Sequence, residues 1–462
     1  MRILLTVHQF LPDFRAGTEI LTLSVARVLI ASGHEVAVLA GHPNRADLTD
    51  DKRLEEYRYE NIPVYRFNHA FSPMGGQSSR MELEYNNSLA ARYFRQILQS
   101  FKPDLVHFFH FGRLGTALID EAIALNVPAF FTPTDFWTIC PNGRLTYSDG
   151  TNCSGPIRGA GNCAIHLAVQ KLGPTVERLV ARIPNSISET MAGIAKSAIM
   201  PVSSIREDLK AIEKRLPINI LRLSSLNHIV APNRMIESCL IEHGVPASII
   251  TRAAYGIDLE LSRIAKPKVR SLVLRVGFIG TLARHKGCHT LIDAFNTFDN
   301  NLATLKIYGN ELDFPEYSKA LRDKSKNNPS ISFNGTFPNS EISKILAEID
   351  VLVVPSAWPE NTPLIIYSAQ AARCPIVASN VPGIAEAIRH GVDGLLFGQG
   401  DHRDLASCLQ RLIREPRLID ELSANISPPR STFDYVDDLL NIWVKRYSDN
   451  SHRTLSPEHR EK

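Results

Sequence analysis

The chain has 462 residues, about three times the length of a typical domain, so two domains with additional elements are expected. An apolar fraction of 44% and a charged fraction of 21% are ordinary for a soluble globular enzyme. The net charge of +3, from 51 basic and 48 acidic side chains, argues against a dedicated nucleic-acid-binding protein.

Targeting signals and cysteines indicate the cellular location of the protein. The start, MRILLTVHQFLP, is typical of a short apolar strand and a loop rather than a signal peptide, and no apolar stretch reaches 18 residues. We therefore expect a cytoplasmic protein, with peripheral membrane contact left open. The seven cysteines are an odd number, and four of them occupy positions typical of buried side chains, so a secreted disulfide scaffold is not expected.

The first half of the chain alternates strands with helices. Residues 2–7 predict a strand, residues 18–32 an amphipathic helix that Gly33 ends, and residues 35–40 a second strand. The alternation continues with predicted strands over residues 64–67, 105–109 and 129–132 and predicted helices over residues 83–100 and 114–125. This pattern specifies a parallel sheet covered by helices, with right-handed crossovers.

Between residues 167 and 226 the sheet pattern stops. This segment is helical in tendency, and it carries nine Lys or Arg against five Asp or Glu. Two interpretations remain open. The helices pack on the first domain, or they form a basic patch that faces a membrane.

The alternating pattern restarts in the second half. Strands are predicted over residues 272–279, 304–308, 331–334, 351–354 and 376–378, with helices between them. The polar run Lys266-Pro267-Lys268 indicates an exposed connection, so we place the domain boundary between Asp258 and Arg270. Residues 448–462 are polar and charged and are expected to be disordered.

The loop after the strand over residues 351–354 is the most informative feature. It places a carboxylate, an amide and a hydroxyl (Glu360, Asn361 and Thr362) at the carboxyl end of a strand, where open α/β sheets bind ligands. Pro363 fits the first turn of the next helix, so the amides around Thr362 and Leu364 are available to an anion. This combination suits a sugar joined to a diphosphate. An ordinary βα loop is the alternative.

A second loop follows the strand over residues 272–279. Gly280 allows the backbone to approach a ligand closely, and Lys286 is expected to reach the same crevice as a counter-charge for phosphate. The alternative is a solvated loop with two charges.

Three cysteines and a histidine follow the strand over residues 129–132. Cys140, Cys153, Cys163 and His166 could form a tetrahedral structural zinc site, because thiolate and imidazole suit this ion. The gaps of 12 and 9 residues between the cysteines are not diagnostic. Thiols that are unpaired or transiently paired and a disulfide therefore remain alternatives.

These features together resemble the retaining family-4 glycosyltransferases (glycosyl transferases group 1), over nearly all of residues 1–435. The resemblance implies the GT-B fold, an α/β architecture of two Rossmann-like domains facing across a cleft. Residues 1–258 would form the acceptor-side domain, with a helical and cysteine-containing insertion at about 138–226, and residues 259–432 the nucleotide-sugar domain. A last helix, residues 433–447, would return to the first domain.

Two family motifs are kept in part. The first is a Glu, seven residues and a second Glu, whose carboxylates contact the donor sugar and the nucleotide ribose. Glu360 matches the first, and Ser368 at the second position leaves at most one hydroxyl hydrogen bond to the ribose. The other motif is a Gly-Arg-Leu pattern completed by Lys-Gly, which is kept at Lys286. Thr281 replaces the arginine, and Arg284 is the candidate for the lost charge.

Further family matches lie at strand ends. Gly17 retains one of two family glycines near the donor diphosphate and acceptor, and Gly335 with Thr336 resembles the strand end that borders the nucleotide base. Thr134 stands where many relatives have a histidine beside the reacting sugar, and it cannot act as a general base near neutral pH. Asp135 is retained and is expected in or near the cleft.

The resemblance implies transfer of a hexose from a nucleotide-diphosphate sugar to an acceptor hydroxyl with retained configuration, in surface polysaccharide or glycoconjugate synthesis. Glu360, Lys286 and Asp135 are the predicted catalytic residues. The leaving diphosphate can take the acceptor's proton, while Lys286 and the amides around Thr362 stabilise its charge. The acceptor would be a saccharide or a lipid-linked saccharide. No cofactor or divalent cation is required, because no Asp-x-Asp pair stands at a cleft strand end.

Several questions stay open at this level. Because Thr281, Ser368 and Thr134 replace expected residues, a non-catalytic nucleotide-sugar-binding protein is an alternative, as is another GT-B enzyme such as a nucleotide-sugar epimerase. His107 is expected in the core, whereas His110 is open between the core and the acceptor side. The sugar, the nucleotide, the acceptor and the oligomeric state are not predicted.

Overall fold

The computed structural model describes the whole chain except residues 44, 71–72, 148–150, 170–182, 197–202, 263–270, 298–300 and 454–462. The chain divides into two compact α/β units. Unit 1 comprises Met1–Leu145, Ser154–Ala254 and Thr432–Lys462, and unit 2 comprises Thr146–Cys153 and Tyr255–Ser431. The division thus falls just before the range expected from the sequence. The run Lys266-Pro267-Lys268, on which that expectation was based, lies outside the described residues.

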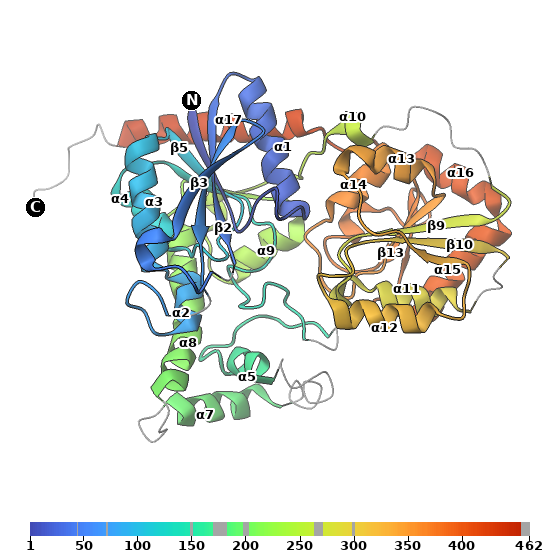
Figure 1. Ribbon diagram of the computed structural model, residues 1–462, viewed down its shortest axis with the longest axis horizontal. Coiled ribbons are helices and arrows are strands. Elements are labelled where there is room, and N and C mark those ends of the chain that lie inside the picture. The colour runs from blue at the N-terminus through green and yellow to red at the C-terminus, as the bar shows by residue number, and fades with distance from the viewer. Residues whose placement is uncertain are drawn as a thin grey trace, which may run out of the picture. The chain divides into compact units, whose positions relative to one another are not determined.

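Unit 1 is built on an eight-stranded sheet of order β3-β4-β2-β1-β5-β6-β7-β8 (Figure 1). The strands are β1 (Arg2–Val7), β2 (Glu35–His42), β3 (Leu54–Tyr59), β4 (Ile62–Asn68), β5 (Leu105–Phe108), β6 (Ala129–Phe131), β7 (His228–Ala231) and β8 (Ile250–Arg252). All neighbours are parallel except β3 and β4, which form an antiparallel pair. The five predicted strands are confirmed, and β3, β7 and β8 add to them.

Helices cover this sheet as the alternating pattern predicts. They are α1 (Gly17–Ala31), α2 (Arg80–Tyr85), α3 (Ser88–Phe101), α4 (Ala117–Ala124) and α9 (Arg234–Glu242). The single helix predicted over residues 83–100 is wrong, because the structure has two helices there. The Asn87 side chain accepts a hydrogen bond from the Ala90 amide and so begins α3 anew.

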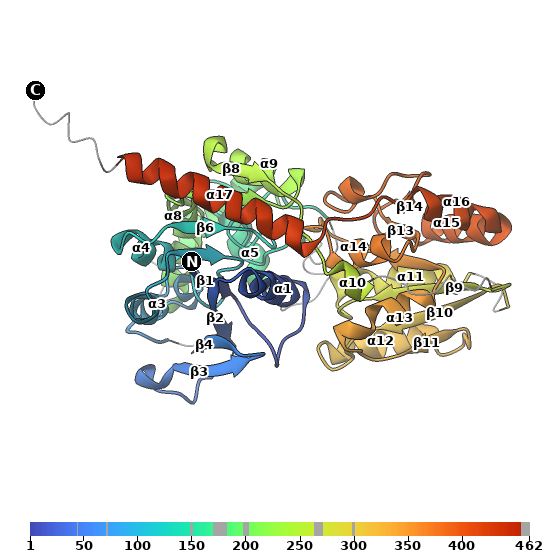
Figure 2. The same ribbon diagram turned by 90° about the horizontal axis from the view of Figure 1, so that it is seen from above.

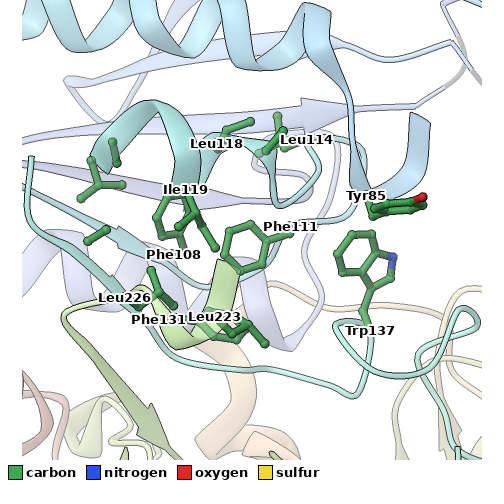
Figure 3. Close-up of a cluster of buried hydrophobic side chains, with 14 of the residues drawn as sticks. Tyr85, Phe108, Phe111, Leu114, Leu118, Ile119, Phe131, Trp137, Leu223 and Leu226 are labelled. Carbon is green, nitrogen blue, oxygen red and sulfur yellow. The ribbon is translucent and has the colours of Figure 1, made fainter. Parts of the chain in front are cut away.

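The insertion expected at about 138–226 contains α5 (Gly161–Val169), α7 (Asn185–Lys196) and α8 (Ser203–Ser224), while residues 170–182 and 197–202 lie outside the described residues. The last turns of α8 pack on unit 1, where Leu223 lies among buried side chains that include Phe108 and Phe131 (Figure 3). Asn219 also donates to the Thr138 carbonyl at 2.7 Å. Packing on the first domain is therefore confirmed for α8.

The membrane-facing interpretation of this segment stays a prediction. In the described part of the chain, none of the helices combines the length and the apolar character needed to cross a membrane.

The last helix, α17 (Thr432–Arg453), belongs to unit 1, as the resemblance implied, and both views show it running past α1 (Figures 1 and 2). Trp443 Nε1 donates to His107 Nδ1 at 3.2 Å, and the Tyr435 hydroxyl lies 3.1 Å from Thr132 Oγ1. His107 is fully buried, as predicted. The helix continues past residue 447 to Arg453, so the expected disordered tail is helical over its first residues, and residues 454–462 lie outside the described part.

Unit 2 has a six-stranded parallel sheet of order β11-β10-β9-β12-β13-β14. The strands are β9 (Leu274–Ile279), β10 (Ala303–Tyr308), β11 (Ile331–Phe333), β12 (Val351–Val354), β13 (Ile376–Ser379) and β14 (Gly394–Phe397). The helices are α10 (Leu259–Ser262), α11 (Cys288–Phe295), α12 (Pro315–Ser325), α13 (Ile342–Ala347), α14 (Leu364–Ala371), α15 (His402–Arg414) and α16 (Pro416–Asn425). The five predicted strands are confirmed, and β14 adds to them. Because β9 and β12 are neighbours, the loops after them meet at one edge.

Candidate functional site

The loop after β9 is brought close to the loop after β12 by a glycine. Residues Arg284–Lys286 form a short 3₁₀ turn, and Gly287 then adopts a positive φ of 72° before α11 begins. A Cβ atom on Gly287 would lie 1.7 Å from the carbonyl oxygen of Pro355, which directly follows β12. Only glycine fits this position, so the contact fixes Lys286 beside the loop that carries Glu360.

Lys286 and Glu360 form an ion pair at this edge of the sheet. Lys286 Nζ lies 2.6 Å from Glu360 Oε1, and the Ser356 hydroxyl donates to the same oxygen at 2.7 Å. Glu360 is 4% exposed, whereas a quarter of the Lys286 side chain is exposed. Oε2 of Glu360 takes no part in either contact. The two residues that the sequence singled out independently therefore form one site, and Ser356, which the sequence analysis missed, belongs to it.

A tryptophan completes the wall beside this ion pair. The Trp358 ring lies 4.8 Å from the His285 ring in an edge-on arrangement, and Lys286 Nζ lies 5.5 Å from its centroid. The indole Nε1 is buried and has no hydrogen-bond partner among the described residues. The sequence offered one signal for Trp358, its position two residues before Glu360.

The turn after Glu360 is held by its side chains. Asn361 donates to the Tyr255 hydroxyl at 2.7 Å, and the buried Thr362 hydroxyl donates to the Gly383 carbonyl at 3.0 Å. Pro363 stands at the N-cap, one residue before α14, so its predicted place in the first helical turn is wrong. The reason is its extended ψ of 131°, which lets α14 begin at Leu364.

The other predicted donor-side residues lie around this edge, with weaker support. Ser368 lies in α14, and Thr281 and Arg284 lie in the loop after β9. A Cβ atom on Gly280 would have only an ordinary contact, at 3.7 Å from Phe278, so packing does not require this glycine.

The close approach of the backbone occurs instead at Gly309, where a Cβ atom would lie 2.4 Å from the Gly280 carbonyl oxygen. Gly335, with a positive φ of 66°, accepts a hydrogen bond from the Gly309 amide at 2.8 Å, and the neighbouring Thr336 is exposed. Gly309 is thus a second residue that the sequence analysis missed.

In unit 1 the predicted residues lie at the carboxyl edge of the sheet. Asp135 Oδ2 lies 3.0 Å from His110 Nε2, and Asp135 Oδ1 accepts a hydrogen bond from the Trp137 amide at 2.7 Å. The Thr134 hydroxyl donates to the Phe109 carbonyl at 3.1 Å. Gly17 is exposed and begins α1.

The predicted zinc site is not formed. The described residues, which include Cys140, Cys153, Cys163 and His166, contain no group of three or more His, Cys, Asp or Glu that could hold a metal ion. Instead, the Cys140 thiol donates to Asn142 Oδ1 at 2.8 Å, and Cys163 packs in a small apolar cluster with Ile212. The disulfide alternative is also overturned, because none of the seven cysteines, all within the described part, forms one.

Comparisons with known proteins agree with this architecture. A family model described as Glycosyltransferase Family 4 matches residues 15–150, and one described as Glycosyl transferases group 1 matches residues 274–415. Two similar solved structures are Anabaena Alr3699/HepE in complex with UDP-glucose (TM-score 0.60, 16% identity, 98% of this chain and 100% of that one) and sucrose-phosphate synthase from Thermosynechococcus elongatus (TM-score 0.65, 15% identity, 97% and 99%). The fold is GT-B, with two parallel-sheet α/β units.

The family resemblance is confirmed: the chain belongs to the group 1, family 4 glycosyltransferases. The amylovoran biosynthesis glycosyltransferase AmsK of Erwinia amylovora is 28% identical over 201 residues, which are 41% of this chain and 49% of that protein. The D-inositol 3-phosphate glycosyltransferase 1 of Catenulispora acidiphila is 25% identical over 328 residues, or 65% and 77%. The first curated relatives are thus matched over about half of their length or less.

Proposed function

We propose that the protein transfers a hexose from a nucleotide-diphosphate sugar to an acceptor hydroxyl, with retention of configuration, in the synthesis of a surface polysaccharide or glycoconjugate. The observation that carries the proposal is the Lys286–Glu360 ion pair at the carboxyl edge of the unit 2 sheet. A relative named for amylovoran biosynthesis and a neighbour named for its UDP-glucose complex support the substrate class.

Each residue of the pair has a distinct role in this proposal. Glu360 would accept hydrogen bonds from hydroxyls of the donor sugar through Oε2, while Oε1 stays bonded to Lys286 and Ser356. Lys286 has three N–H donors and uses one on Glu360, so it can also contact an oxygen of the diphosphate. Its positive charge would stabilise the leaving diphosphate, with help from the amides around Thr362.

The remaining steps need no protein base. In a retaining transfer the acceptor attacks from the face that the diphosphate leaves, so a diphosphate oxygen can take the acceptor's proton. The protein then acts by positioning the two substrates and by stabilising charge. Thr281, Arg284, Ser368, Gly280, Gly335 and Thr336 would line the nucleotide, and Asp135 and Gly17 would lie on the acceptor side. The acceptor would be a saccharide, either unattached or lipid-linked.

A panel of uridine, guanosine and thymidine diphosphate hexoses tests this proposal. We expect one donor to bind with saturation and to be turned over, either slowly by water or faster with a saccharide acceptor. Saturable binding of a donor without any turnover would instead identify a non-catalytic binder, the reading that Ser368 at the second motif position favours. Epimerised donor in the product mixture would identify the other GT-B class.

A further inference from the structure

Two histidines and two carboxylates gather at the carboxyl edge of the unit 1 sheet. Strands β1, β5 and β6 are neighbours, and the residues that follow them meet there. His8 follows β1, His110 follows β5, and Asp135 follows β6, while Glu19 lies in the first turn of α1. Of these four, the proposed function uses only Asp135.

The orientation of His110 is fixed from both sides of its ring. The Gly112 amide donates to Nδ1 at 2.8 Å, so Nδ1 is an acceptor and the ring proton resides on Nε2. Nε2 therefore donates to Asp135 Oδ2 at 3.0 Å. The ring lone pair on Nδ1 is taken up by the Gly112 amide and is therefore not available to a substrate hydroxyl. The hydrogen bond that His110 donates instead orients the carboxylate of Asp135.

His8 and Glu19 support His110 from the other face. The His8 and His110 rings are 4.2 Å apart at their centroids, and a Cβ atom on Gly112 would lie 2.9 Å from the His110 ring. His8 Nε2 lies 3.4 Å from Oε1 of Glu19, which is completely buried. His8 Nδ1 is buried and has no hydrogen-bond partner among the described residues. A side chain at position 112 would therefore collide with the His110 ring, and glycine leaves room for it.

Burial opposes charge on both residues of the supporting pair. Burial raises the pKa of the Glu19 carboxyl, although the Gln9 side chain and nearby amides oppose the rise. Burial also lowers the pKa of His8 well below its usual value, and the nearby Arg113 guanidinium adds to that effect. Both shifts favour the neutral forms. Of the two carboxylates, Asp135 is the one that a ligand can reach, because its side chain is 32% exposed whereas that of Glu19 is fully buried.

We propose that Asp135, held in place by His110, binds a hydroxyl group of the acceptor saccharide, and that His110 is a positioning residue for acceptor binding. This inference rests on the proposed function, because the acceptor hydroxyl enters there. A carboxylate that already accepts from His110 and from the Trp137 amide keeps further lone pairs for a donor on the ligand. An anionic ligand group would be repelled. The nearby Arg113 guanidinium, which donates to the His8 carbonyl, disfavours a cationic one.

Titration with simple saccharides in the absence of any nucleotide sugar tests the inference. The probes are the methyl α-glycosides of glucose, galactose and mannose, followed by saturation-transfer NMR on the full chain. The variants are Asp135→Asn, His110→Phe, which keeps the ring but removes the N–H, and His110→Gln, which keeps an N–H donor. The control is His34→Gln, which changes a half-buried histidine directly before β2, at the opposite edge of the sheet.

At least one glycoside is expected to bind the unaltered protein. Its dissociation constant should rise about tenfold or more in His110→Phe and Asp135→Asn, as expected for a lost hydrogen bond to a charged group. His110→Gln should recover most of the affinity, and His34→Gln should not change it. In transfer assays, His110→Phe should raise the KM for the acceptor and leave the KM for the donor unchanged, a split that a purely structural role would not produce.

Three outcomes would overturn the inference. The first is that no glycoside binds, and the second is that neither His110→Phe nor Asp135→Asn changes the affinity. The third is that Glu360→Gln abolishes glycoside binding instead. The last result would place the glycoside at the donor-side residues and leave the proposed function standing. The proposed function would instead be refuted by the absence of donor binding. The glycoside titration does not depend on donor binding. If His110→Phe loses its thermal unfolding transition, Asp135→Asn and His110→Gln decide the question.

Discussion

The carboxyl edges of the two sheets are built by the same topology but carry different chemistry. In unit 2 the edge holds an ion pair between the partly exposed Lys286 and the buried Glu360. In unit 1 it holds His8 and Glu19, whose pKa values burial shifts toward the neutral forms, and the partly exposed carboxylate of Asp135. Parallel strands decide where side chains gather, and the residues in the loops then decide which ligand charge the edge suits. A lysine suits a diphosphate, whereas a single oriented carboxylate suits a hydroxyl.

The largest expected effect is loss of the unit 2 ion pair. Lys286→Met should lower kcat/KM by about 100-fold or more, because one preorganised charged donor at a developing negative charge is commonly worth that much. Steady-state kinetics with the donor found in the panel measure this. Lys306→Met is the matched control, because Lys306 forms an ion pair with Glu348 at 2.8 Å in the same unit. An equal fall of kcat/KM in the two variants would contradict a special role of the carboxyl edge of the unit 2 sheet.

The next effect concerns the glycine that brings the two loops together. Gly287→Ala should lower the free energy of unfolding by about 1–3 kcal/mol from its positive φ alone, and by more from the contact with Pro355. Activity should fall with stability, because Lys286 moves away from Glu360. Gly193→Ala in α7 is the control, since no atom lies within 4 Å of its new Cβ. Urea denaturation compares the two; an unchanged midpoint for Gly287→Ala would contradict the close contact.

A third prediction separates an interior histidine of unit 1 from the histidine at its edge. Burial lowers the pKa of His107 to about 3, well below its value of about 6.5 in an unfolded chain. The unfolded chain therefore binds the proton first as the pH falls. The stabilising contribution of neutral His107 is complete above pH 6.5 and is lost between pH 6.5 and about 3, at up to about 1.4 kcal/mol per pH unit.

Unfolding measured over this pH range should show that loss, to which His69, His228 and His289, each with a pKa lowered to about 4, also contribute. His107→Gln should reduce the slope by about one proton, relative to the unaltered protein. A slope that His107→Gln leaves unchanged would show that His107 takes up a proton in the folded protein.

The smallest effect is expected from Ser356→Ala. This change removes one hydrogen bond to Oε1 of Glu360 and leaves the bond from Lys286 in place. A loss of about 1 kcal/mol, or about fivefold in kcat/KM, follows for a single hydrogen bond within a site that stays otherwise intact. Kinetics with the donor sugar measure it. A loss as large as that of Lys286→Met would mean that Ser356, rather than Lys286, orients the Glu360 carboxylate.

Much of the fold could be predicted because its signals are local. Ten strands carry apolar runs long enough to recognise, and their alternation with helices fixes a parallel sheet. Two of the four missed strands have weaker signals: β8 has three residues, of which two are exposed, and β3 alternates exposed and half-buried side chains at the edge of its sheet. The break between α2 and α3 depends on the Asn87 cap, which the apolar periodicity hides.

The candidate site could be predicted where a residue type and its loop together indicate a chemical role. Glu360 and Lys286 stand in recognisable loops, and adjacent strands bring them together. Ser356 and Trp358 were missed because a serine and a tryptophan in a loop have many uses, and only the fold shows what they face. The zinc prediction failed for the reverse reason, since suitable ligand types that are far apart in sequence need not meet in space.

The role of Glu360 is tested most directly by calorimetry with a nucleotide sugar and with the matching nucleoside diphosphate, on the unaltered protein and on Glu360→Gln. Because Glu360 would contact the sugar and Lys286 the diphosphate, the substitution should weaken binding of the nucleotide sugar by about tenfold and leave the diphosphate nearly unchanged. Equal affinity of Glu360→Gln and the unaltered protein for the nucleotide sugar would contradict the assignment of this edge as the donor site.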